Sequence, residues 1–210
     1  MIMNSPQIHS IFPKPIYFTN IGRKFTKKEI NFVKQQKNHS HNNEGNITSD
    51  NNYLLKKPEF KNINKILTEH CQKYLDTVIC PKDNIKLYIT QSWLNYTDAN
   101  QFHHKHEHPN SVVSGVLYFD SDINNDKILF SHSKGYQQIS PIIDDKKFNL
   151  WNSATWFFPV KTGDLVMFPS STTHQVQTKK GNNTRISLAF NTFYKGDLGG
   201  SRNGLSELIL

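Results

Sequence analysis

From Pro81 onward, short segments rich in β-branched and aromatic residues alternate with glycine, asparagine and aspartate. Such segments are typical of β-strands, and the residues between them are typical of turns. The predicted strands cover residues 85–96, 102–108, 112–119, 127–131, 155–159, 164–168, 174–178 and 185–194. Eight short strands in succession predict a mainly β protein built as a sandwich, jelly roll or barrel.

The first eighty residues are different in character and predict helices. Thr26 and Glu29 have the spacing of a capping box, so a helix is expected to begin at Thr26. A second helix is predicted over 58–77, where apolar residues recur at helical spacing. Residues 9–19 are expected to be extended, and the polar segment 38–52 is expected to be a mobile loop. Helices that precede strands in this way favour packing on the outside of a β core.

A chain of 210 residues is long enough for one domain with a proper core. We therefore expect a single domain, in which residues 1–80 supply an N-terminal strand and supporting helices. Residues 85–195 then form the β core, and residues 196–210 form a C-terminal tail. The connection 133–153 is long for a simple turn and is interpreted as a lid or insertion.

Composition indicates the cellular compartment and the classes of partner to expect. Neither an apolar run long enough to span a membrane nor a secretory leader is recognisable, and the two cysteines form no CxxC pattern. A reducing, cytoplasmic compartment is expected. The formal net charge of +8 comes from lysines that occur singly or in pairs, without interleaved aromatic residues. This pattern favours a solvated surface over a nucleic-acid site, although it does not exclude nucleic acid.

A histidine-rich segment lies in the predicted strand 102–108. Because side chains alternate along a strand, one face is expected to carry His104, His106 and His108. The opposite face is then expected to carry His103, Lys105 and Glu107. Imidazoles that are separated by one residue on a strand can converge on a single metal ion, for which histidine is a common ligand.

A candidate site is completed by His174 and Arg185, which lie much farther along the chain. His174 follows a predicted strand and turn, and it is the obvious third ligand. Arg185 opens a strand whose polar face also carries Ser187 and Asn191. An arginine on an inward face is costly without an anion, and a guanidinium beside a hydroxyl is suited to a carboxylate.

Each of these features also has a simpler interpretation. Clustered histidines can form an adventitious surface metal site, and Arg185 alone can form a structural salt bridge. His70 and Cys71, on the apolar stripe of the second helix, are expected to be packing residues. The order His-x-His, a long gap, His, a short gap and Arg-x-Ser is more specific than any one part.

These residues resemble the iron(II)/2-oxoglutarate dioxygenase superfamily, to which the prolyl hydroxylases are related. The resemblance is carried by residues 106–118, by Phe168–Pro169–Ser170 before His174, and by residues 185–191. More narrowly, these segments resemble the 2-oxoglutarate oxygenases of bacteria and their phages. The similarity covers about residues 91–191 and extends only loosely to the helices.

The resemblance implies a double-stranded β-helix, the jelly roll of cupin-like proteins, with iron(II) at its mouth. His106, His108 and His174 take the positions of the metal ligands, although His108 stands where the family has a carboxylate. His104 remains an alternative for His106 or His108, and a coordination position that is left open is the alternative to a third imidazole. Arg185 takes the position that binds the distal carboxylate of 2-oxoglutarate. The remaining pocket residues implied are Ser187, Tyr118, Asn95 and Ser114.

The implied activity is hydroxylation of an unidentified small-molecule or peptide substrate, with 2-oxoglutarate converted to succinate and carbon dioxide. The alternatives are a non-catalytic cupin-like domain that binds a metal or small ligand, and a three-histidine dioxygenase that does not use 2-oxoglutarate. A nucleic-acid demethylase of the same superfamily is a further alternative. The expected location is the cytoplasm, that of the host cell for a phage protein, and a homodimer is compatible with the sequence.

Overall fold

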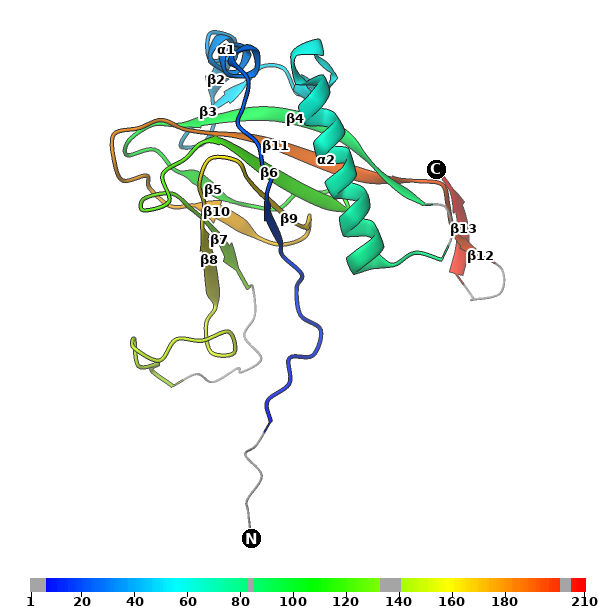
Figure 1. Cartoon of the computed structure of the whole chain (residues 1–210). Coiled ribbons are helices and arrows are strands. Elements are labelled where there is room, and N and C mark those ends of the chain that lie inside the picture. The colour runs from blue at the N-terminus through cyan, green and yellow to red at the C-terminus, as the bar shows by residue number, and fades with distance from the viewer. Residues whose placement is uncertain (1–6, 83–84, 133–140, 201–204) are drawn as a thin grey trace.

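Two antiparallel sheets form the core of the structure, a computed structural model that describes residues 7–82, 85–132, 141–200 and 205–210 (Figure 1). The larger sheet has the strand order β1 (Tyr17–Asn20), β9 (Asp164–Pro169), β6 (Val113–Asp120), β11 (Arg185–Lys195), β4 (Lys86–Thr97), β3 (Ile47–Ser49) and β2 (Ser40–Asn42). The smaller sheet has the order β5 (His103–His106), β10 (His174–Val176), β7 (Lys127–Ser131) and β8 (Thr155–Pro159). The two sheets form the predicted jelly roll.

Two helices cover the face of the larger sheet that lies away from the smaller sheet (Figure 1). They are α1 (Lys27–Gln36) and α2 (Lys61–Tyr74), and α2 continues into a π-helical turn, Leu75–Ile79. Short 3-10 turns, Leu54–Lys56 and Pro58–Phe60, precede α2. The predicted capping box is confirmed, because the Glu29 amide donates to Thr26 Oγ1 and the Thr26 amide donates to the Glu29 carboxylate.

Regular alternation over most of β4 and β11 separates two apolar layers. Leu188 lies opposite Leu94 in the register of these strands, and both side chains pack towards the helices. Ser187 lies opposite Asn95, so these side chains point into the space between the sheets. The layer between sheet and helices includes Leu67, Cys71, Leu94, Leu188 and Phe190. The layer between the two sheets includes Tyr118, Ile128, Phe130, Val166 and Phe168.

The predicted packing roles of two helical residues are confirmed. Cys71 is fully buried, and burial raises the pKa of its thiol to about 12, so it is an inert core residue. His70 lies at the edge of the same layer, where its Nδ1 is 2.8 Å from the Tyr17 hydroxyl.

The predicted strands are confirmed with boundaries that differ by a few residues, but other predictions need correction. The segment 38–52 contains the hairpin β2–β3, in which Ser40 pairs with Ser49, and this hairpin extends the larger sheet. Strand β5 ends at His106 instead of residue 108. Within the predicted tail, β12 (Asp197–Gly200) pairs with β13 (Leu205–Ile209). Of the predicted extended segment 9–19, only the last residues belong to a strand.

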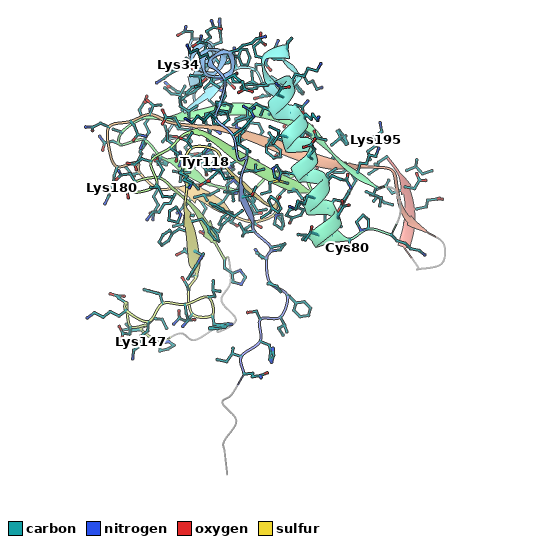
Figure 2. All side chains as sticks on the ribbon, viewed as in Figure 1. Lys34, Cys80, Tyr118, Lys147, Lys180 and Lys195 are labelled. Carbon is teal, nitrogen blue, oxygen red and sulfur yellow. The ribbon has the colours of Figure 1, made fainter. Side chains whose placement is uncertain are left out.

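Residues 133–140 of the predicted insertion lie outside the described residues. In the described parts of the chain, no helix is long and apolar enough to cross a membrane. Figure 2 places the labelled lysines at the periphery of the molecule, and Lys34, Lys147, Lys180 and Lys195 are all exposed. Tyr118, by contrast, lies in the interior and is only 1% exposed.

Candidate active site

Three imidazoles converge where the two strands β5 and β10 meet. His106, the last residue of β5, pairs directly with His174, the first residue of β10, and their ring centroids are 4.3 Å apart. His108 follows the end of β5, and its ring lies 4.9 Å from that of His106 and 5.1 Å from that of His174. One ligand atom of each residue lies within 4.8 Å of the others, so the three side chains form a candidate metal centre.

The backbone fixes the orientation of two of these rings. The Nδ1 atom of His106 is 2.8 Å from the carbonyl oxygen of His104, and the Nδ1 atom of His174 is 3.0 Å from that of Thr172. A carbonyl oxygen can only accept, so each Nδ1 carries the proton and each Nε2 keeps a free lone pair. Metal-binding histidines are typically held in this way.

Burial keeps the three imidazoles neutral. Burial, together with the neighbouring histidines, lowers the pKa of His174 to about 3 and that of His108 to about 4. The pKa of His106 is also lowered, first by burial. Neutral imidazoles at neutral pH are competent ligands for a borderline divalent metal such as iron(II), so the donor set fits that ion.

Arg185 is a buried cation without a described counter-ion. It is 2% exposed, and its Nε and Nη1 atoms have no hydrogen-bond partner among the described residues. Its Cζ lies 5.9 Å from the ring centroid of Tyr118, and burial lowers its pKa. A buried charge with unsatisfied donors is strongly unfavourable, so the surroundings of Arg185 are suited to an anion from solution.

Other polar residues share the inward face of the larger sheet with Arg185. Ser187 lies on the same face of β11 and is opposite both Asn95 on β4 and Tyr118 on β6. Burial raises the pKa of Tyr118 to about 12, so its phenol remains a protonated donor. The Asn95 Oδ1 and Thr97 Oγ1 atoms have no partner in the described part of the chain. The structure therefore brings four predicted pocket residues to one inward-facing region of the larger sheet, namely Arg185, Ser187, Tyr118 and Asn95.

Ser114 has a different environment from these four residues. Its hydroxyl lies 2.8 Å from the hydroxyl of Ser170 and donates to Asn191 Oδ1 at 2.8 Å. The carbonyl of Ser170 accepts a hydrogen bond from the amide of His108 at 3.0 Å. Ser114 thus supports the segment that carries His108, and a direct contact with the co-substrate stays a prediction.

A bulge in β5 changes the expected order of the histidines. His174 pairs with His106 but Val176 pairs with His103, so three residues of β5 span two residues of β10. His103 therefore lies on the same side as His106, and their rings stack at 4.6 Å. The prediction that His103 faces away from His106 is wrong. Glu107 is exposed and accepts a hydrogen bond from Thr173, which agrees with its predicted orientation away from the metal.

His103 connects the metal centre and Arg185 electrostatically. Its pKa is lowered to about 2, first by burial and then by the neighbouring histidines and Arg185. Both parts of the candidate site, the histidine cluster and Arg185, therefore disfavour protonation of His103. This residue was missed in the sequence because a bulge depends on pairing with a distant strand.

A cavity of about 450 Å³ opens in front of the imidazoles. Its lining includes His103, His104, His106 and His108 together with Asn43, Asn52, Gln91, Trp93 and Asn191. Gln91 had no assigned role in the predicted pocket, although a signal was present. Gln91 and Trp93 share one face of β4 with Asn95, because residues two positions apart on a strand point the same way.

Residues 91–191 match the profile of the family described as "Putative 2OG-Fe(II) oxygenase". The chain belongs to the 2OG-Fe(II) oxygenase family. All three imidazoles and Arg185 lie within the matched segment of this oxygenase, and the recognition made from its sequence is confirmed. No curated protein matches the chain significantly.

Solved structures of low sequence identity share the fold of this oxygenase. HygX from Streptomyces hygroscopicus, solved with nickel, 2-oxoglutarate and hygromycin B bound, has a TM-score of 0.58 and 10% identity over 85% of this chain and 82% of its own. AviO1 from Streptomyces viridochromogenes Tue57 has a TM-score of 0.53 and 14% identity over 83% and 88%. A Trichoplax adhaerens prolyl hydroxylase, in complex with a hypoxia inducible factor peptide, has a TM-score of 0.53 and 12% identity over 85% and 83%. These similarities confirm the predicted double-stranded β-helix.

Proposed function

We propose that this oxygenase holds iron(II) through His106, His108 and His174 and binds 2-oxoglutarate through Arg185 to hydroxylate a second substrate. The observation that carries the proposal is the buried guanidinium of Arg185, whose Nε and Nη1 have no described partner. It shares the interior of the sandwich with three neutral, convergent imidazoles. A metal-binding domain that recognises no anion would not need that charge.

The three imidazoles set the charge of the metal centre. They are neutral ligands, so an iron(II) centre here would keep a full double positive charge, one unit more than with a carboxylate ligand. That charge strengthens the attraction for a 2-oxoglutarate dianion. Iron(II), when bound, supplies the oxygen chemistry that converts 2-oxoglutarate to succinate and carbon dioxide and hydroxylates a C–H bond.

Arg185 and its neighbours would hold the other end of the co-substrate. The guanidinium donates from two nitrogens, and a carboxylate can accept both hydrogen bonds in a forked arrangement. The hydroxyls of Ser187 and Tyr118 are additional donors on the same inward-facing surface. Binding the dianion satisfies the buried charge, and it directs the 2-oxo acid end towards the imidazoles.

The cavity in front of the imidazoles would receive the second substrate. Its lining combines the carboxamides of Asn43, Asn52 and Gln91 with the indole of Trp93, and it includes no carboxylate, lysine or arginine from the described residues. Such a surface favours an uncharged substrate with several hydrogen-bonding groups. HygX holds hygromycin B and the prolyl hydroxylase holds a peptide, so a small molecule and a peptide are both within the range of this fold.

Formation of succinate from 2-oxoglutarate tests the proposal without the second substrate. The wild-type protein with iron(II) is expected to form succinate slowly, and the double variant His106→Ala/His174→Ala is expected to form none. His39→Ala is the matched control, because His39 is exposed and lies outside the site. Succinate formation that persists in the double variant contradicts the metal assignment. Metal binding without consumption of 2-oxoglutarate by the wild type indicates a non-catalytic domain.

A further inference from the structure

A second group of histidines adjoins the three proposed iron ligands. One ligand atom each of His103, His104 and His106 lies within 4.8 Å of the others. The ring centroids of His103 and His104 are 5.1 Å apart, and that of His104 lies 4.7 Å from that of His106. The bulge in β5 produces this group. It places His103 on the same side of the strand as His106, whereas regular alternation would place the two on opposite sides.

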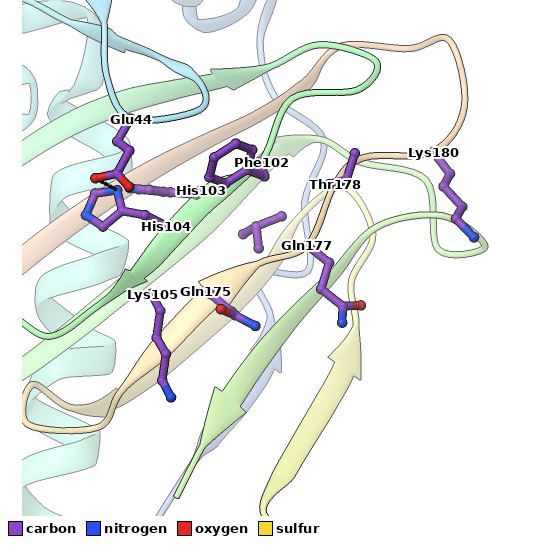
Figure 3. Close-up of a pocket in the computed structure, with 10 residues that line it drawn as sticks. Glu44, Phe102, His103, His104, Lys105, Gln175, Gln177, Thr178 and Lys180 are labelled. Carbon is purple, nitrogen blue, oxygen red and sulfur yellow. Dashed lines mark ion pairs between the residues drawn. The ribbon is translucent and has the colours of Figure 1, made fainter. Parts of the chain in front are cut away.

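A carboxylate reaches this group from another part of the chain. Glu44 lies in the turn between β2 and β3, and its Oε2 is 3.8 Å from Nδ1 of His104 (Figure 3). The Nδ1 atom of His104 is buried and has no hydrogen-bond partner in the described ranges. A separation of 3.8 Å is too long for a hydrogen bond. Two ligands of one zinc ion, each with a bond of about 2.0–2.2 Å, stand about 3–4 Å apart, so the spacing suits a shared cation.

The backbone holds the turn of Glu44 against the beginning of β5. The amide of Phe102 donates to the carbonyl of Gly45 at 2.9 Å. Gly45 has a φ of 88°, and a Cβ added to it would lie 2.7 Å from the carbonyl oxygen of Phe102. Only glycine permits this approach, so Gly45 helps to place Glu44 beside His104.

His106 cannot serve two ions at once. Its Nδ1 carries the proton donated to the carbonyl of His104, which leaves only Nε2 as a ligand atom. When His106 binds an ion together with His108 and His174, the donors that remain are His103 and His104, with the carboxylate of Glu44 beside His104. Two imidazoles and a carboxylate form a complete set of three protein ligands for a zinc-like ion, whose remaining position is filled by water.

We propose that His103, His104 and Glu44 form an outer site for a borderline divalent cation such as Zn²⁺, separate from the inner site of His106, His108 and His174. Imidazole nitrogens select such ions over Mg²⁺ and Ca²⁺, which prefer oxygen ligands. The outer site does not depend on 2-oxoglutarate turnover, so it goes beyond the proposed function.

The position of the outer site gives it a structural effect. His103 and His104 line the 450 Å³ cavity and also a second cavity of about 590 Å³, whose lining includes Glu44 and Lys105 (Figure 3). His103 and His104 therefore lie in the wall between the two cavities, and Glu44 lines the larger one. An ion held there fastens the β2–β3 turn to β5 at the rim of the proposed substrate cavity.

Titration of the metal-free, full-length protein with Zn²⁺, followed by calorimetry and native mass spectrometry, tests the outer site. The wild type is expected to bind two ions. Glu44→Gln and His104→Ala are each expected to lose one ion and to keep the other. His174→Ala is expected to lose the inner ion and to keep the outer one. Because Glu44 is largely exposed, its replacement leaves the fold intact.

His41→Ala is the matched control for these variants. His41 lies in the same hairpin and pairs with a carboxylate, that of Asp50, at 2.7 Å, but it belongs to neither group of ligands. This variant is expected to bind two ions. A wild type that binds a single ion, lost in His174→Ala, overturns the outer site and leaves the inner site standing. Retention of both ions in Glu44→Gln and in His104→Ala overturns the assigned ligands.

Discussion

His174 on β10 lies directly opposite His106 on β5, with the two ring centroids 4.3 Å apart. The backbone pairing of the two strands sets this distance, and hydrogen bonds from each Nδ1 to a carbonyl set the orientation of the rings. The fold therefore sets the positions and orientations of these proposed metal ligands without an ion.

His174→Ala is expected to abolish iron(II) binding and succinate formation. Removal of a hydrogen-bond partner of a metal ligand typically lowers affinity about 10–100-fold, so removal of the ligand itself is expected to exceed that range. Anaerobic titration with iron(II) measures the affinity, and His39→Ala serves as the control. An affinity for iron(II) equal to that of the wild type would show that His174 is not a ligand.

Arg185→Met is expected to change stability and co-substrate binding in opposite directions. Methionine retains much of the length of the side chain without the buried charge, and such replacements of buried ionic groups stabilise proteins by about 1–4 kcal/mol at best. We expect a higher free energy of unfolding in the ligand-free protein and a KM for 2-oxoglutarate raised at least about tenfold. Urea unfolding and initial rates measure the two effects. An unchanged KM contradicts the role assigned to Arg185.

The metal-free protein is expected to lose stability as the pH falls below neutrality. The pKa of His174 is about 3 and that of His108 about 4 in the folded protein, whereas an unfolded histidine titrates near about 6.5. Between these values the unfolded chain binds more protons, so each histidine removes up to about 1.4 kcal/mol per pH unit. The stabilisation that these neutral histidines provide is fully present above the unfolded pKa of about 6.5. It is lost as the pH falls towards the folded pKa values of about 3 and about 4.

Urea unfolding of the metal-free protein at a series of pH values measures this dependence. His174→Ala removes one of the titrating groups, so its stability is expected to fall less steeply with decreasing pH. His39→Ala, which changes an exposed histidine, is expected to match the slope of the wild type. Equal slopes in wild type and His174→Ala would show that His174 does not titrate as the buried site requires.

Lys179→Met is expected to destabilise the fold by about 3–5 kcal/mol. The Nζ of Lys179 lies 3.0 Å from Oδ1 of Asp126, and both side chains are almost completely buried. Loss of the lysine leaves a buried carboxylate without its charged partner. The double variant Lys179→Met/Asp126→Leu removes both charges and is expected to recover much of the loss. Thermal unfolding of Lys179→Met, of Asp126→Leu and of the double variant measures the coupling, and strictly additive effects would contradict it.

Much of the fold could be predicted because its strands are regular. In β11 the alternation of Ser187, Leu188 and Ala189 separates an inner from an outer face, and the pairing with β4 preserves that separation over most of the strand. The same regularity identified Arg185 as inward-facing, and its burial confirms this. The order of the histidines along the chain predicted that His174 lies beside His106 and His108, and the structure brings the three together.

The remaining features depend on contacts between distant segments. The bulge that turns His103 inward is defined by the pairing of β5 with β10, which lies about seventy residues farther along the chain. The hairpin β2–β3 is polar and resembles a loop in composition. It is a strand pair because Ile47 and Thr48 pair with β4. The sequence of such a segment carries little intrinsic preference for a strand.

The proposed metal ligands and the proposed anion partner belong to opposite layers of the molecule. His106 and His174 are part of the four-stranded sheet, whereas Arg185 is part of the seven-stranded sheet. Sheets packed face to face stand about 10 Å apart, and tight interior packing makes this spacing hard to alter. In the proposed arrangement, the spacing between the sheets therefore sets the length of the 2-oxo diacid that can bridge them. An acid with one methylene fewer would leave either its chelating end or its distal carboxylate out of reach.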